Sequence, residues 1–225
     1  MILLLGDIHG DYKTLQRAID MAADAEAAAI IQVGDFGLFR GHGMANELEF
    51  IEVLKTATVP VYFIDGNHDD CTRWISYTEV SQIYPTIPFY YVPRGTVMEL
   101  DGRTIAFMGG AASIDRHTRI TEHRHWDVNE LISADQYARM LDNAKGKNID
   151  MFITHCPPNS VIQENFDNHT KLLFGVGIDW EDPTQKQIEE LWHAMGTPVI
   201  YSGHMHRRVI GEVHRILNIN ELLAV

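Results

Sequence analysis

Gly6-Asp7-Ile8-His9-Gly10 follows directly on the apolar run Ile2–Leu5 near the start of the chain. A short apolar run that ends abruptly in Gly, Asp, Asn or His is typical of a buried strand with a polar loop at its carboxyl end. The pattern recurs four times, at Gly34-Asp35-Phe36-Gly37, Gly66-Asn67-His68-Asp69, His155-Cys156-Pro157-Pro158 and Gly203-His204-Met205-His206. These five motifs predict buried strands whose polar ends gather at one edge of a sheet.

Helical patterns lie between the apolar runs. Residues 12–25 carry apolar side chains at i, i+3, i+4 and i+7, which predicts an amphipathic helix, and 44–54 predict a second. Ser133 with Gln136 is typical of a capping box, and Asp182-Pro183 is typical of a helix start. The first three strands alternate with helices, which predicts right-handed parallel connections.

A different pattern follows from Phe89. Three further strands are predicted at Phe89–Val92, Thr96–Leu100 and Arg103–Met108, the last two joined by a hairpin turn at Asp101-Gly102. Val209–Val213 and Ile216–Ile219 predict another antiparallel pair. We expect one α/β domain over residues 1–225, with two packed sheets and helices outside.

Length and composition limit the function. A chain of 225 residues accommodates one domain or at most two. Lys and Arg number 18 and Asp and Glu 31, so the formal net charge is −13, which disfavours long nucleic acid and anionic membranes as partners. A phosphate substrate stays possible, because bound divalent metals reverse the local field. No apolar run approaches the roughly 18 residues of a membrane span. Two cysteines, too few for a disulfide framework, indicate a reducing cytoplasm.

The strand-end motifs supply seven potential metal ligands. Each alone is also ordinary turn chemistry, but five such motifs, each directly after a buried strand, favour a shared metal centre. Asp35 has two carboxylate oxygens and could bridge two ions. The mixture of oxygen and imidazole donors suits two divalent ions such as Mn²⁺, Fe, Zn²⁺ or Ni²⁺ better than Ca²⁺ or Mg²⁺ alone. The seven residues are Asp7, His9, Asp35, Asn67, His155, His204 and His206.

Taken in order, these motifs resemble those of the calcineurin-like metallophosphoesterase superfamily, from Asp7 to His206. The resemblance implies a four-layer α/β/β/α sandwich with a dinuclear metal centre. It assigns one metal to Asp7, His9, Asp35 and His206, and the other to Asp35, Asn67, His155 and His204. It further implies that His68 is the catalytic histidine beside the phosphate and that Asp69 orients it.

The subfamily narrows the expected substrate. The second motif departs from the Gly-Asp-x-Val-Asp-Arg-Gly of Ser/Thr phosphatases, whereas Gly-Asn-His-Asp is more similar to the phosphodiesterase branches. We therefore expect a two-metal phosphodiesterase that acts on a small soluble phosphodiester, such as a cyclic or modified nucleotide. A phosphomonoesterase or phosphoprotein phosphatase is the alternative enzyme. A non-catalytic scaffold of the same fold is disfavoured, because all seven ligands and His68 are present. The oligomeric state is left open.

One stretch outside the motifs is unusually basic and aromatic. Residues 111–126 form either a solvated loop or a substrate arm in which arginine meets a phosphate oxygen and tryptophan stacks on a base. Arg40, after the second motif, is a further candidate at the rim. The candidates within the stretch are Arg116, His117, Arg119 and Trp126.

Overall fold

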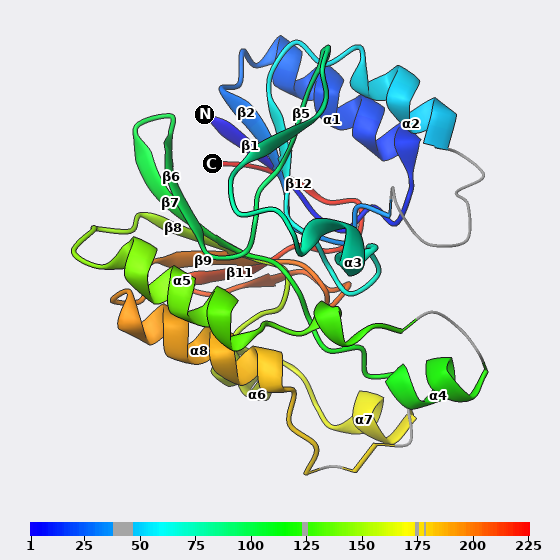
Figure 1. The fold of residues 1–225 in the computed structure, drawn as a ribbon, viewed down its shortest axis with the longest axis vertical. Helices are drawn as coiled ribbons and strands as arrows, with labels where there is room; N and C mark the ends of the chain where they lie inside the picture. Colours follow the sequence, from blue (N-terminus) through cyan, green and yellow to red (C-terminus); the bar gives the residue numbers. More distant parts are fainter. Residues whose placement is uncertain (38–46, 123–125, 174–175, 178) are drawn as a thin grey trace.

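The computed structural model describes residues 1–37, 47–122, 126–173, 176–177 and 179–225. Within these residues the chain forms two mixed six-stranded sheets, ordered β12-β1-β2-β3-β5-β4 and β10-β11-β9-β8-β7-β6 (Figure 1). Each sheet has four parallel strands at its centre and an antiparallel strand at either edge. The α/β sandwich predicted from the sequence is confirmed.

The first sheet collects the amino-terminal strands. Its parallel strands lead into the first three motifs, with α1 and α2 in the connections. Asp11 caps α1, because its carboxylate accepts the backbone amides of Lys13 and Thr14. The elements of this half are β1 (Ile2–Leu5), α1 (Tyr12–Asp24), β2 (Ala29–Gln32), α2 (Glu47–Leu54), β3 (Val61–Phe63), α3 (Cys71–Trp74), β4 (Ser81–Tyr84), β5 (Ile87–Tyr91) and β12 (Leu222–Ala224).

The second sheet begins where the chain crosses over after β5. Asp101 and Gly102 have φ of 52° and 71°, as a tight hairpin between β6 and β7 requires. The predicted capping box of Ser133 and Gln136 opens α5. The elements are β6 (Thr96–Leu100), β7 (Arg103–Met108), α4 (Arg116–Thr121), a 3₁₀ turn (Val128–Glu130), α5 (Ala134–Ala144), β8 (Met151–Thr154), α6 (Asn159–Asn165), α7 (His169–Leu173), α8 (Pro183–Ala194), β9 (Val199–Ser202), β10 (Val209–Ile210) and β11 (His214–Ile216).

Three apolar clusters define the four layers. Leu3 and Leu5 of β1 pack with the helices α1 and α2, while Ile2 and Leu4 face the other sheet. The middle cluster joins the sheets through residues such as Ile31 and Phe107, and the third packs β7 and β8 against α5, α6 and α8. Because alternate side chains of a strand point to opposite faces, one buried strand contributes side chains to two apolar clusters.

Several sequence predictions need correction. The antiparallel pair predicted at Val209–Val213 and Ile216–Ile219 is present but shorter and shifted, as β10 and β11. β11 ends at Ile216, and beyond it the Asn218 side chain accepts the Ile219 amide in a turn. The edge strands β4 and β12 were not predicted, and neither was helix α4 inside the basic stretch. Part of the second expected helix, including Met44, lies outside the described residues. None of the helices in the described part of the chain combines the length and apolarity needed to span a bilayer.

Candidate metal centre

The polar motifs meet at the carboxyl ends of both sheets. Asp7 and His9 follow β1, Asp35 follows β2, and Asn67 and His68 follow β3. From the second sheet, His155 follows β8, while His204 and His206 follow β9. Because the two sheets are packed face to face, their polar ends lie side by side, and all seven predicted ligands are connected by short contacts.

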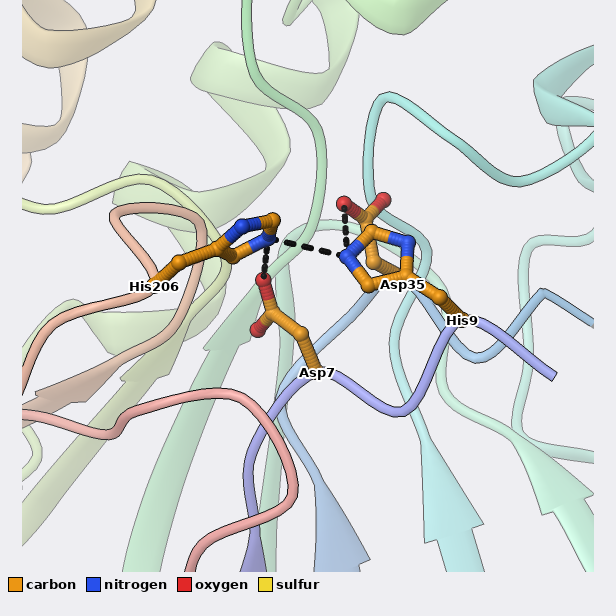
Figure 2. A group of neighbouring side chains, drawn as sticks. All are labelled: Asp7, His9, Asp35 and His206. Carbon is orange, nitrogen blue, oxygen red and sulfur yellow. Dashed lines mark hydrogen bonds and ion pairs between the residues drawn. The ribbon is translucent and has the colours of Figure 1, made fainter. Parts of the chain in front are cut away.

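Four of these side chains converge on one point, shown in Figure 2. The Nε2 atom of His206 lies 3.2 Å from Oδ2 of Asp7 and 2.9 Å from Nε2 of His9. His9 Nε2 in turn lies 3.8 Å from Oδ2 of Asp35. One donor atom from each residue lies within 4.8 Å of the others, so the group is close enough to share one cation.

Among the other predicted ligands, His155 contacts the same carboxylate oxygen of Asp35 as His9 does. His155 Nε2 lies 3.5 Å from Oδ2 of Asp35 and 3.2 Å from Oδ1 of Asn67. The ring of His204 lies 5.1 Å from that of His155, centroid to centroid. His204 also forms a separate cluster with Cys156 and Asp182. Asp35 therefore contacts histidines from both groups, as a bridging carboxylate would.

The electrostatics of this cluster favour a positive charge at its centre. Burial alone would raise the pKa of Asp35, yet His155, His9 and His204 together lower it to about 2. Burial alone would lower the pKa of His155, but Asp35 and Asp7 raise it to about 10. Buried carboxylates thus hold a proton on a neighbouring imidazole. A divalent ion supplies the same charge without that proton, so the donor set fits a metal.

The backbone is strained where the ligands sit. His9, Asp35, His204 and His206 have φ between 44° and 68°, in the left-handed region that most side chains avoid. Gly203 makes room for the Asp7 carboxylate, because a Cβ at position 203 would collide with it. Such strain costs on the order of 1–3 kcal/mol per residue and clusters at functional sites. The sharp turns aim successive side chains at one centre.

Comparison with known proteins identifies this arrangement. A model of the calcineurin-like phosphoesterases matches residues 1–208. The chain belongs to the calcineurin-like phosphoesterase family. It is therefore a metal-dependent phosphoester hydrolase. Its fold is also similar to the crystal structure of TT1561 of Thermus thermophilus, with a TM-score of 0.56 and 14% identity over 97% of this chain and 89% of that one. No curated protein sequence matches the chain.

His68 lies beside the candidate metal ligands of this phosphoesterase. Its backbone amide donates to Oδ1 of Asp35 at 2.7 Å, and its half-buried ring packs edge-on against His9 at 5.1 Å. The Asp69 carboxylate accepts backbone amides of Gly37 at 2.7 Å and Gly66 at 2.8 Å. These contacts hold together the loops that carry Asp35 and Asn67.

The candidate substrate-binding residues of the basic stretch lie in different environments. Arg119 is buried at 9% exposure and lines a cavity of about 590 Å³ that also contains Asp35, Asn67, His68, His204 and His206. Arg116 and His117 are exposed on α4, and neither is among the described residues that line the cavity. Trp126 donates from Nε1 to Oε1 of Glu130 at 2.8 Å. Arg40 lies outside the described residues.

Two residues with no assigned role fix a predicted ligand. Nδ2 of Asn67 donates to Oγ of Ser113 at 3.1 Å, which leaves the carbonyl oxygen of Asn67 facing His155. Both oxygens of Glu130 bind Ser113, one the hydroxyl and one the backbone amide, each at 2.7 Å. Ser113 and Glu130 are almost completely buried, so this chain is shielded from water. Because Glu130 lies 17 positions from Ser113, no local sequence pattern indicates that the two residues are in contact.

Replacing Ser113 by Ala should weaken metal binding by roughly 10–100-fold, because residues that orient a ligand commonly contribute that much. The measurement is metal content and affinity by calorimetry, with the melting temperature recorded for each variant. Ser113→Thr keeps the hydroxyl and should restore the affinity. Equal metal affinity in wild type and Ser113→Ala would contradict the role of Asn67 as a ligand that Ser113 orients.

Proposed function

We propose that this phosphoesterase is a cytoplasmic phosphodiesterase that hydrolyses a small phosphodiester, such as a cyclic or modified nucleotide. Two divalent transition metals, Mn²⁺ being the best match to the imidazole-rich donor set, would occupy the centre. Asp7, His9, Asp35 and His206 would hold one ion, and Asp35, Asn67, His155 and His204 the other. When bound, the ions make water a nucleophile at neutral pH and offset charge that grows on the phosphoryl oxygens.

The observation that carries the proposal is the contact between Arg119 and His68. Nη2 of Arg119 lies 3.1 Å from Nε2 of His68, and Nε of Arg119 is held by Oδ1 of Asp115 at 2.8 Å. The same Nη2 atom lies 3.5 Å from Nδ1 of His68, and because a guanidinium can only donate, this contact favours a neutral ring over an imidazolium. A phosphate that binds Arg119 would draw the guanidinium from the ring, leaving His68 Nε2 able to hold a proton for the departing oxygen.

Charge around the cavity favours a diester over a monoester. A diester phosphate carries one negative charge, whereas a monoester carries close to two near neutral pH. The lining includes the carboxylates of Asp115, Asp167 and Asp182 and two guanidinium groups, those of Arg207 and of Arg119, the latter already paired with Asp115. The less charged diester meets less repulsion from these carboxylates than a monoester would.

The first experiment compares metal-loaded protein on bis-nitrophenyl phosphate and mono-nitrophenyl phosphate. We expect a higher kcat/KM for the diester, complete loss of activity in excess chelator, and the best recovery with Mn²⁺. Preference for the monoester would overturn the proposed substrate class. Full activity in chelator would overturn the assignment of metals to the reaction.

Replacing Arg119 by Ala should lower kcat/KM for the diester by roughly 10–100-fold, because a hydrogen bond to a charged group contributes about 1.5–3 kcal/mol. Arg116→Ala is the matched control, since it removes an exposed arginine from the same helix. Kinetics should be accompanied by metal content and melting temperature. Identical kinetics in the two variants would show that Arg119 does not bind substrate.

Replacing His68 by Ala should slow a nucleotide diester far more than an activated aryl diester, with metal content unchanged. Nitrophenolate leaves without a proton, whereas a ribose alkoxide needs one, and general acid catalysis contributes roughly 10²–10⁴-fold. The measurement is kcat/KM for both substrates in wild type and variant. Equal losses on both would indicate instead that His68 stabilises charge on the phosphoryl group.

A further inference from the structure

The cavity at the metal centre continues into a second one. The first encloses about 590 Å³ and the second about 480 Å³, a size range typical of small-molecule sites. The two cavities adjoin, because six residues line both, and we call the space along these six residues the groove. It leads away from the candidate ligands, none of which is among the described residues that line the second cavity. The residues that line both cavities are Ile114, Phe166, Asp167, Trp180, Gln185 and Met205.

The shared wall is aromatic and apolar. Phe166 and Met205 are anchored, because both pack against the apolar cluster beneath the second sheet. The guanidinium carbon of Arg207 lies 5.3 Å from the Phe166 ring centroid, which holds the ring further in place. Trp180 is half-buried and lies between α7 and α8. Two aromatic side chains on one wall, with an adaptable methionine, suit a flat ring system.

The charged residues of the second cavity indicate which substituents the bound ring system can carry. The lining of this cavity includes the carboxylates of Asp167, Asp179 and Glu181 but, among its described residues, only one cation, Lys171. Further phosphates along the groove would meet repulsion, which disfavours polyphosphates and nucleic acid strands. The Gln185 amide can both donate and accept, as the edge of a base requires. A neutral nucleoside fits both features, because its base can stack on the aromatic wall and it brings no negative charge near the carboxylates.

We propose that this groove, defined by the six shared residues, is the subsite for the base of a nucleoside whose only phosphate is the scissile one. The inference rests on the proposed phosphodiesterase activity, because that activity places the phosphate at the metal centre. Trp180 would stack on the base and Gln185 would contact its edge. The substrate class narrows accordingly to nucleoside monophosphate diesters, including cyclic ones.

The test compares two diesters with the same scissile group, one of a nucleoside and one of glycerol. In wild type the nucleoside diester should have the higher kcat/KM. In Trp180→Ala the ratio of the two kcat/KM values should fall by roughly 5- to 150-fold, which is about 1–3 kcal/mol of stacking converted at tenfold per 1.4 kcal/mol. Trp180→Phe keeps an aromatic face and should restore most of the ratio. Leu173→Ala, which alters an exposed residue of α7, should leave the ratio at its wild-type value.

A second readout does not depend on catalysis. Adenosine, which has no phosphoester bond to hydrolyse, should bind the metal-loaded protein in calorimetry and bind more weakly to Trp180→Ala. An unchanged ratio together with equal adenosine binding would overturn the subsite while leaving the phosphodiesterase proposal intact. Adenosine binding without hydrolysis of either diester would overturn the proposed activity and support the subsite.

Discussion

The geometry of the site depends on the interactions of the Asp35 carboxylate. One of its oxygens accepts the backbone amide of His68, and the other faces the imidazoles of His9 and His155. These partners come from three loops and from both sheets. A carboxylate with 1% exposure is costly to bury unless its oxygens are satisfied, so the loops are constrained to stay where they satisfy it. The positions of His68 and Asn67 follow from that constraint.

The parts of the fold that were predictable are those specified locally. The capping box at Ser133 and the Asp101-Gly102 turn each depend on residues within four positions, and both were found as expected. β12 depends instead on pairing with β1, more than two hundred residues away. It is three residues long and partly exposed, so neither length nor alternation distinguishes it from a loop. β4 pairs locally with β5, but none of its four residues is fully buried, so no alternating apolar pattern marks it as a strand.

In the candidate site, too, locally specified features were predictable from the sequence and long-range contacts were not. Its ligand candidates were visible because each follows a buried strand, and parallel strands end at a common edge. Nothing in the sequence indicated that Ser113 would contact Asn67, since they are 46 positions apart. Trp126 illustrates the converse, because its surroundings indicated base stacking while its indole nitrogen donates to the buried Glu130. Aromatic residues near basic ones cannot be assigned to substrate or to packing without the three-dimensional contacts.

Because the candidate ligands come from both sheets, metal binding affects how long the protein survives in the cell. Each sheet has an apolar cluster with its own helices, but the candidate metal ligands come from both. Ions that bind only the folded chain therefore oppose separation of the halves, by about 4 kcal/mol at a thousandfold excess over Kd. That is a large part of the roughly 5–15 kcal/mol that ordinarily separates folded from unfolded protein. Metal scarcity would then shorten survival against proteases as well as stop turnover, so cellular abundance would follow metal supply.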